Sequence, residues 1–173
     1  MKELILGGVR SGKSRYAEQR ALASTLPVIY VATAAAGDAE MHARIRAHQE
    51  RRPATWTLIE TPRTLAATLR THAAPERCVL VDCLTLWLTN LLCAEDEIGF
   101  RAERTALLEV LPTLPGHIIL VSNETNMGVI PLGELSRRFG DEAGCLHQEL
   151  APLCDHVVLT VAGLPFFLKG TST

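Results

Sequence analysis

The sequence has no cysteine pair spaced as CxxC, no long basic segment and no apolar run that is long enough to cross a bilayer. Its longest apolar stretch, residues 79–93, is interrupted by Asp82 and Asn90 and is shorter than the roughly 20 residues that a membrane helix needs. The 17 basic and 19 acidic residues leave a net charge of −2, which argues against a general nucleic-acid binder. We therefore expect no nucleic-acid partner and no membrane insertion.

The chain also lacks the charged start and small-residue cleavage site of a signal peptide, because its N-terminus leads directly into an apolar run. Most of its cysteines lie inside apolar segments, which favours buried, reduced thiols over a disulfide framework. The cysteines are Cys78, Cys83, Cys93, Cys145 and Cys154. We expect a cytoplasmic protein.

No repeat, low-complexity segment or long linker divides the chain. Hydrophobic residues make up 47% of the 173 residues and charged residues 21%, which is a globular composition. This length is ordinary for one domain with a substantial core. We expect a single nucleotide-binding domain over residues 1–173, for the reasons that follow.

A glycine-rich segment directly follows the apolar run at residues 4–6. It matches the phosphate-binding P-loop, in which two glycines five positions apart precede lysine and then serine or threonine. Its residues are Gly7, Gly8, Val9, Arg10, Ser11, Gly12, Lys13 and Ser14. Glycines let successive backbone N–H groups turn toward phosphate oxygens, and the helix that begins here directs its positive end at the anion. Lys13 can reach the terminal phosphates, and the Ser14 hydroxyl can ligate Mg²⁺.

The flanks of this segment favour a ligand-binding loop. A strand candidate precedes it, and residues 14–23 are good helix formers. The alternative is a glycine-rich turn between a strand and a helix that binds nothing. Motif, flanks and N-terminal placement agree on the P-loop, so we predict that the protein binds a nucleoside triphosphate.

The rest of the chain alternates strand and helix patterns. Strands are expected at residues 4–6, 27–33, 56–60, 78–82, 117–122 and 156–161, with buried runs at 27–33 and 117–122. Helices are expected after the P-loop and at residues 38–51, 63–72, 84–92, 101–111 and 132–153, with a solvated turn at 95–97. This order predicts an α/β fold: a P-loop NTPase-type three-layer arrangement with a mostly parallel sheet flanked by helices.

Three of the expected strands end in candidate ligand-binding residues. Small residues around Ala34 follow the strand at 27–33, and ligands collect at the carboxyl ends of parallel strands. Asp82 ends the apolar strand at 78–82, as in a Walker B element whose acid holds Mg²⁺ directly or through water. Apolar runs that end in aspartate also occur by chance, but the preceding P-loop favours a functional Asp82. Glu60 ends the strand at 56–60.

His48 lies on the expected helix at 38–51, on one face with Met41, Arg44 and Ile45. A histidine on an apolar face is most often a satisfied core residue. Here it stands among cations that suit a site for phosphates. These cations are Arg44, Arg46, Arg51 and Arg52.

Taken together, the segments resemble one enzyme family over nearly the whole chain. In order they are GGVRSGKSR, RIRAHQERRPATWTLIETP, VLVDCLTLWLTNLL, VSNETNMGVIP, RRFGDEAG and VAGLP. They are similar to bifunctional adenosylcobinamide kinase / adenosylcobinamide-phosphate guanylyltransferase. The P-loop is shared with many NTPases, whereas the run at 44–62 is much more specific. The family usually has glycine at the position of Asn126, a residue that tolerates left-handed backbone, so we expect the turn to survive.

The resemblance implies two reactions late in cobalamin assembly. The aminopropanol hydroxyl of adenosylcobinamide is phosphorylated, and GMP from GTP is then transferred onto that phosphate, giving adenosylcobinamide-GDP and pyrophosphate. The transfer runs through a guanylylated histidine, which corresponds to His48, with Lys13 as the second catalytic residue. Also implied are ATP, GTP and Mg²⁺ as ligands, a corrinoid substrate and a homo-oligomer with sites near subunit boundaries.

The resemblance further assigns nucleotide contacts to the P-loop and to residues outside it, with Ser14 and Asp82 as metal ligands. The contacts outside the P-loop are Ala32, Thr33, Ala34, Gln49, Glu50, Arg51, Arg52, Glu60 and Asp82. The chemistry fits, since a neutral imidazole, with a reference pKa of about 6.5, is a competent nucleophile near neutral pH.

Three other functions stay open at this point. One is a P-loop small-molecule kinase of another specificity, in which His48 is structural. A second is a nucleotide-dependent switch or assembly ATPase, which has no reason to carry the run at 44–60. The third is a family member that retains only guanylyl transfer. ATP and GTP both stay open as the phosphoryl donor.

Overall fold

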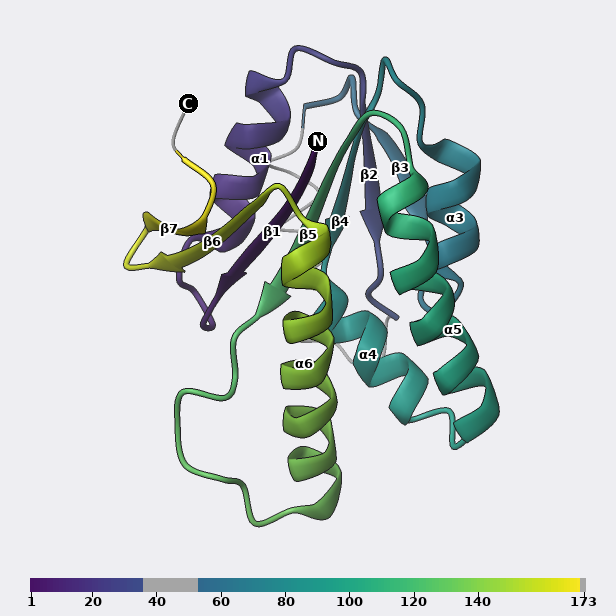
Figure 1. Ribbon diagram of the computed structural model, residues 1–173, viewed down its shortest axis with the longest axis vertical. Coiled ribbons are helices and arrows are strands. Elements are labelled where there is room, and N and C mark those ends of the chain that lie inside the picture. Colours follow the sequence, from purple (N-terminus) through teal and green to yellow (C-terminus); the bar gives the residue numbers. More distant parts are fainter. Residues whose placement is uncertain (36–52, 172–173) are drawn as a thin grey trace.

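The computed structural model describes residues 1–35 and 53–171, and their core is one seven-stranded sheet (Figure 1). The strands are β1 (Lys2–Gly7), β2 (Val28–Ala32), β3 (Thr57–Glu60), β4 (Cys78–Asp82), β5 (His117–Asn123), β6 (His156–Val161) and β7 (Leu164–Lys169). The helices are α1 (Lys13–Ala23), α3 (Leu65–His72), α4 (Leu84–Leu92), α5 (Glu97–Val110) and α6 (Glu134–Leu153), with a short 3-10 turn at Leu111–Thr113.

The strand order is β3-β2-β4-β5-β1-β6-β7. All neighbouring strands are parallel except β6 and β7, which form an antiparallel pair. The central strands β1, β4 and β5 are buried almost throughout, which explains why they are continuous apolar runs in the sequence. The expected mostly parallel sheet is confirmed.

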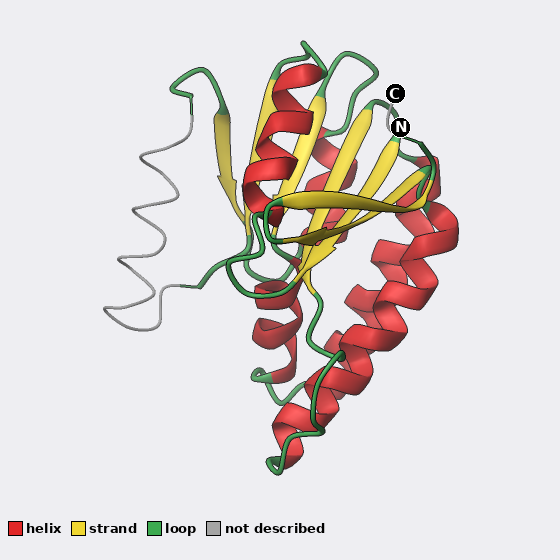
Figure 2. Ribbon diagram, turned by 90° about the vertical axis from the view of Figure 1, so that its left-hand side faces the viewer, coloured by secondary structure: helices red, strands yellow, loops and turns green. Residues whose placement is uncertain are grey.

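Helices pack on both faces of the sheet (Figure 2). Alternate residues of one strand point to opposite faces, so Leu4 and Leu6 of β1 pack with the helices α3 to α6, whereas Ile5 packs on the α1 side. Ala17 and Ala21 of α1 are fully buried, and their small side chains let this helix lie close to the sheet. The resulting three layers are those of the expected fold.

The structure differs from the sequence-based elements at two places. Strand β7 was not expected, because the segment after residue 161 lies on the sheet edge and carries exposed apolar side chains instead of a buried run. Helix α5 begins at Glu97, inside the expected turn, because the Asp96 side chain accepts a hydrogen bond from the Gly99 N–H (2.9 Å) and caps the helix. Glu95, with φ of 54°, keeps the turn.

The other boundaries agree within two residues. Helices α3 and α6 each begin two residues later than expected, at Leu65 and Glu134. The expected helix at 38–51 lies outside the described residues. Across residues 1–35 and 53–171, no helix is both long and apolar enough to cross a membrane.

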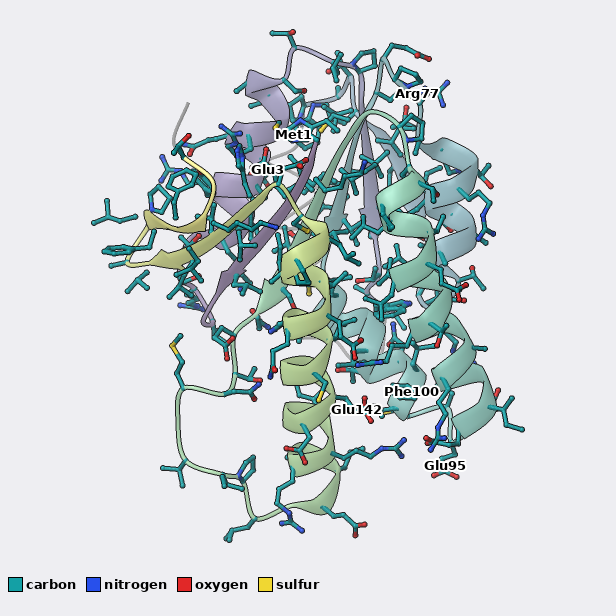
Figure 3. All side chains as sticks on the ribbon, viewed as in Figure 1. Met1, Glu3, Arg77, Glu95, Phe100 and Glu142 are labelled. Atoms are coloured by element: carbon teal, nitrogen blue, oxygen red, sulfur yellow. The ribbon has the colours of Figure 1, made fainter. Side chains whose placement is uncertain are left out.

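A buried charge cluster joins β1, α1 and β5. Glu3, labelled in Figure 3, is fully buried. It accepts hydrogen bonds from Arg20 Nε (3.0 Å) and Nη2 (2.9 Å), and its Oε1 lies 2.7 Å from His117 Nε2. Burial by itself would raise the pKa of the Glu3 carboxyl, but its hydrogen bonds with His117 and Arg20 outweigh burial and hold this pKa below its ordinary value.

We expect Glu3→Gln to lower the free energy of unfolding by about 3 kcal/mol at neutral pH, because it leaves the Arg20 charge without its buried partner. Since the folded-state pKa of Glu3 is depressed, its contribution is complete above the unfolded-state pKa of about 4.3 and is lost as the pH falls through the lower folded-state value. Urea unfolding of both proteins across this range measures the difference. A difference independent of pH would contradict a role for the carboxylate charge.

Candidate nucleotide site

The strand register aligns the predicted site residues along one edge of the sheet. Ala32, the last residue of β2, is in register with Glu60 of β3 and with Asp82 of β4. Gly7, the last residue of β1, is in register with Asn123 of β5 and with Thr160 of β6. The P-loop and both acids therefore lie at the carboxyl edge of the sheet, where ligands bind in folds of this kind.

The P-loop runs from the end of β1 to the start of α1, as expected. Two of its residues have left-handed backbone, Arg10 with φ of 57° and Gly12 with φ of 96°. The Gly12 carbonyl accepts the N–H of Tyr16 (2.9 Å), and helix α1 follows at Lys13. Residues of alternating handedness at a helix N-terminus form a concave array of N–H donors, which is an anion site.

The turn between β6 and β7 packs against the P-loop. The Gly163 N–H donates a hydrogen bond to the Ser11 carbonyl (2.8 Å). A Cβ on Gly12 would lie 2.9 Å from Gly163 Cα, and a Cβ on Gly7 would lie 2.6 Å from the Thr160 carbonyl oxygen. Close packing thus requires glycine at positions 7 and 12, in addition to the requirement set by the ligand. The segment VAGLP supplies this turn, which is a structural role that the sequence did not reveal.

Lys13 is half-buried, and its Nζ donates to the Gly8 carbonyl (3.2 Å). Burial lowers the pKa of the Lys13 ammonium, while the nearby Asp82 carboxylate acts in the opposite direction. Lys13 therefore lies within electrostatic range of Asp82. A lysine held over the loop in this way is available to an arriving phosphate.

Asp82 is half-buried at the end of β4, and its Oδ2 accepts a hydrogen bond from the Tyr30 hydroxyl (3.0 Å). The Tyr30 ring in turn stacks on Trp56, with centroids 6.3 Å apart. Within the described part of the chain, no three His, Cys, Asp or Glu side chains form a metal site. The Asp82 carboxylate and the Ser14 hydroxyl, completed by phosphate oxygens and water, match the way in which Mg²⁺ is held beside nucleotides.

Thr33 fixes the backbone after Asp82. Its fully buried hydroxyl donates to the Cys83 carbonyl (2.6 Å) and accepts from the Cys83 N–H (3.0 Å). Asn90 of α4 donates to the Thr33 carbonyl (2.7 Å) and to the Pro62 carbonyl (3.0 Å). The segments that follow β2, β3 and β4 are therefore held together by side-chain hydrogen bonds. Thr33 stabilises the site through its hydrogen bonds with the backbone of Cys83.

We expect Thr33→Val to cost about 1–3 kcal/mol in the free energy of unfolding, because it leaves the Cys83 N–H and carbonyl buried without their partner. Thr33→Ser retains the hydroxyl and is the matched control, which we expect to lie close to the wild type. Chemical unfolding of the three proteins provides the measurement. Equal stability of the valine and serine variants would show that these two hydrogen bonds contribute nothing.

The remaining predicted residues divide into two groups. Glu60 is exposed at the carboxyl edge, and Ala34 follows Thr33 there. The predicted catalytic His48 and its neighbours lie outside the described residues. These neighbours are Gln49, Glu50, Arg51 and Arg52.

A polar cluster at the end of β5 was missed by sequence reasoning. The Glu124 N–H donates to the Gly7 carbonyl (3.0 Å). His147 of α6 places Nε2 2.8 Å from Ser122 Oγ and Nδ1 3.6 Å from Glu124 Oε2. Burial lowers the pKa of His147, and the Glu124 carboxylate opposes this shift. The available signal was the polar residues Ser122 and Glu124 at the end of an apolar strand. Their partner, His147 of α6, is distant in the sequence and could not be paired with them.

The cysteines are all unpaired, as expected, but not all are buried. Cys78, Cys83 and Cys154 are buried, whereas Cys93 and Cys145 are exposed. Burial raises the pKa of the Cys83 thiol to about 11, so this residue beside Asp82 is neutral at physiological pH. It is not an activated nucleophile.

The family model described as cobinamide kinase / cobinamide phosphate guanyltransferase matches residues 3–168. The chain belongs to this family. The cobinamide kinase / guanyltransferase resemblance inferred from the sequence is thereby confirmed, and with it the two transferase activities of the family and a nucleotide-binding site. The geometry of the P-loop agrees with this membership.

Two relatives of this cobinamide kinase / guanyltransferase chain share nearly its full length. It is 63% identical over 170 residues to the bifunctional adenosylcobalamin biosynthesis protein CobP of Pseudomonas aeruginosa, covering 98% of both chains. It is 38% identical over 183 residues to CobU of Salmonella typhimurium, covering 98% of this chain and 100% of that protein.

Solved structures confirm the fold alone. The RadB recombinase matches 91% of this chain and 73% of its own, with a TM-score of 0.52 and 18% identity. The ATPase EscN of an enteropathogenic E. coli type III secretion system matches 93% of this chain and 43% of its own, with a TM-score of 0.51 and 11% identity. The P-loop NTPase-type fold is thus shared with proteins of very different sequence.

Proposed function

We propose that the chain phosphorylates adenosylcobinamide and then transfers GMP from GTP to the product through His48, with one P-loop serving both steps. The observation that carries the proposal is the joint position of the P-loop, Lys13 and Asp82 at the carboxyl edge of the sheet, in a chain of this family. Kinase and guanylyl transfer both need a triphosphate held in one orientation, which this arrangement supplies.

In the kinase step, the P-loop N–H groups and Lys13 hold the β- and γ-phosphates. The aminopropanol oxygen attacks the γ-phosphorus, the bond to the leaving nucleoside diphosphate breaks, and the hydroxyl proton leaves. Asp82 and Glu60, which end β4 and β3 at this edge of the sheet, are the carboxylates to which we assign this proton. Lys13 stabilises the charge that develops on the phosphoryl oxygens.

In the guanylyl step, a ring nitrogen of neutral His48 attacks the α-phosphorus of GTP. An N–P bond forms, the bond to the β-phosphate oxygen breaks, and pyrophosphate leaves. The phosphate of adenosylcobinamide phosphate then attacks the same phosphorus, and the imidazole departs. Two displacements replace one direct reaction between highly charged phosphates. Arg51 and Arg52 carry the charge to bind those phosphates.

Ser14 and Asp82 are the residues that would hold Mg²⁺, since both offer hard oxygen ligands beside the phosphate site. The ion neutralises phosphate charge when it is bound. The proposal also includes a single domain over residues 1–173 and a cytoplasmic location. It further includes a homo-oligomer, and light scattering of the purified protein tests this oligomeric state.

Phosphate labelling of GTP tests the proposal. The protein is incubated with Mg²⁺ and GTP that is labelled at the α- or the γ-phosphate, and is then denatured. We expect acid-labile, base-stable label on the protein from α-labelled GTP only, as a histidine phosphoramidate requires. Adenosylcobinamide phosphate should then discharge it as adenosylcobinamide-GDP. Phosphorylation of adenosylcobinamide without any α-label would favour a plain kinase and a structural His48.

A further inference from the structure

A cavity of about 330 Å³ opens between α4, α6 and the loop that joins β5 to α6. We call residues 124–133 the β5–α6 loop; it extends beyond the sheet beside α6 (Figure 1). The walls are mainly apolar, with hydroxyl and amide groups among them. Their principal residues are Leu92, Cys93, Asn126, Pro131, Leu135 and Phe139.

Side-chain hydrogen bonds hold the β5–α6 loop in place around this cavity. Asn126 Nδ2 donates to the Gly140 carbonyl (3.1 Å), and its backbone N–H donates to Glu124 Oε1 (2.7 Å). A Cβ on Gly144 would lie 2.8 Å from Asn126 Nδ2, so two glycines of α6 make room for this side chain. Arg137 donates to the carbonyls of Pro131 and Leu132.

Asn126 therefore has a different role from the one suggested by its place in the sequence. Among the described residues, the non-glycine positions with positive φ are Arg10, Thr25, Glu95 and Ala162. Asn126 is not one of them, so its tolerance of left-handed backbone does not maintain the turn. Its side chain instead attaches the loop to α6 and lines the cavity.

The β5–α6 loop and the start of α6 also expose a group of large apolar side chains. Val129 and Leu132 are each 97% exposed. Neighbouring apolar side chains of the same group are also open to solvent, namely Met127, Ile130 and Leu135. Exposed apolar side chains that gather next to a cavity indicate a binding site.

This surface begins at the nucleotide site. The Glu124 N–H donates to the carbonyl of Gly7, the first P-loop glycine (3.0 Å), and the Asn123 N–H donates to Thr85 Oγ1 of α4 (2.7 Å). The cavity wall starts at Thr125, the next residue along the chain. A ligand in the cavity thus lies at the same edge of the sheet as the P-loop.

We propose that the cavity and the β5–α6 loop bind the corrin ring of the cobinamide substrate. This inference rests on the proposed function and deepens it. The corrin periphery carries methyl groups and primary amides, and the cavity presents apolar walls with the hydroxyl and amide groups of Thr125, Ser136 and Asn126. The cavity takes one edge of the ring, the exposed apolar side chains cover its face, and the aminopropanol arm extends toward the P-loop.

Two exposed cysteines provide a footprint of this site. Cys93 lines the cavity, whereas the equally unpaired Cys145 of α6 is not part of its lining and serves as the internal reference. We expect adenosylcobinamide, at about ten times its dissociation constant, to slow alkylation of Cys93 by about tenfold while the rate at Cys145 stays unchanged. GTP alone should slow neither reaction.

Three results would overturn the assignment: equal protection of both thiols, protection of neither, or a Cys93 rate in the free protein that falls as protein concentration rises. The last result would mean that a second copy of the chain covers the cavity. If the enzyme converts adenosylcobinamide but Cys93 is unprotected, the corrin site alone is wrong. If no conversion occurs with either ATP or GTP, the proposed function is wrong.

A cavity-filling variant provides the second test. Leu135 is 53% exposed, so Leu135→Trp can occupy the cavity without entering the core. We expect the KM for adenosylcobinamide to rise about tenfold, with the KM for the nucleotide unchanged. Phe166→Trp, at a residue of β7 that is 68% exposed, is the matched control and should change neither constant. An unchanged corrinoid KM, or equal changes in both constants, would overturn the assignment.

Discussion

Lys13→Ala is expected to abolish phosphorylation of adenosylcobinamide and guanylyl transfer together, each by about 10³-fold or more. The Lys13 ammonium is the P-loop cation near Asp82, and it donates a hydrogen bond to the Gly8 carbonyl. In the proposed function, both reactions build charge on phosphate oxygens that this ammonium binds. Separate assays with ATP and adenosylcobinamide, and with GTP and adenosylcobinamide phosphate, measure the two losses.

Two variants serve as controls for this result. Lys13→Arg keeps the charge but changes its geometry, and we expect it to recover only part of either activity. Arg70→Ala removes an exposed cation from α3 and should leave both activities at the wild-type level. Loss of one activity in Lys13→Ala with retention of the other would contradict a shared P-loop and require a second triphosphate site.

The buried parts of the fold were predictable from the sequence because a buried strand consists almost entirely of apolar residues. Strands covered on both faces, such as β4 and β5, are uninterrupted apolar runs. Six of the seven strands were expected from the sequence, among them the edge strand β3, which is short and mostly exposed. Strand β7 lies at the edge with exposed side chains, so its pattern resembles that of a loop. The start of α5 depended on one capping side chain, Asp96, which periodicity does not register.

The candidate site was predictable only where its chemistry is local in the sequence. The P-loop is eight consecutive residues, and Asp82 is marked by the strand that it ends. The support of Gly12 by Gly163, and the contact between His147 and Ser122, join residues that only the folded chain brings together. The role of Asn126 likewise depends on Gly140 and Gly144 of α6, which make room for its side chain. The sequence does not indicate this role, because only the folded chain places the β5–α6 loop beside these glycines.

His48→Ala is expected to separate the two activities that Lys13→Ala removes together. Guanylyl transfer should fall by on the order of 10⁴-fold or more, because the side chain that we propose as the GMP acceptor is gone. Phosphorylation of adenosylcobinamide needs no nucleophile from the protein, so it should stay within about threefold of the wild type. The protein-bound α-label should disappear. GTP binding, measured by equilibrium titration, should persist.

The matched control is His72→Ala, which removes a histidine from the end of α3 that leads into β4, at the edge of the sheet opposite the P-loop. It should retain both activities and the label. The decisive quantity is the ratio of the two activities, because a general loss of structure lowers both and leaves this ratio near its wild-type value. Equal losses in His48→Ala, in a protein that still binds GTP with wild-type affinity, would contradict a covalent role for His48.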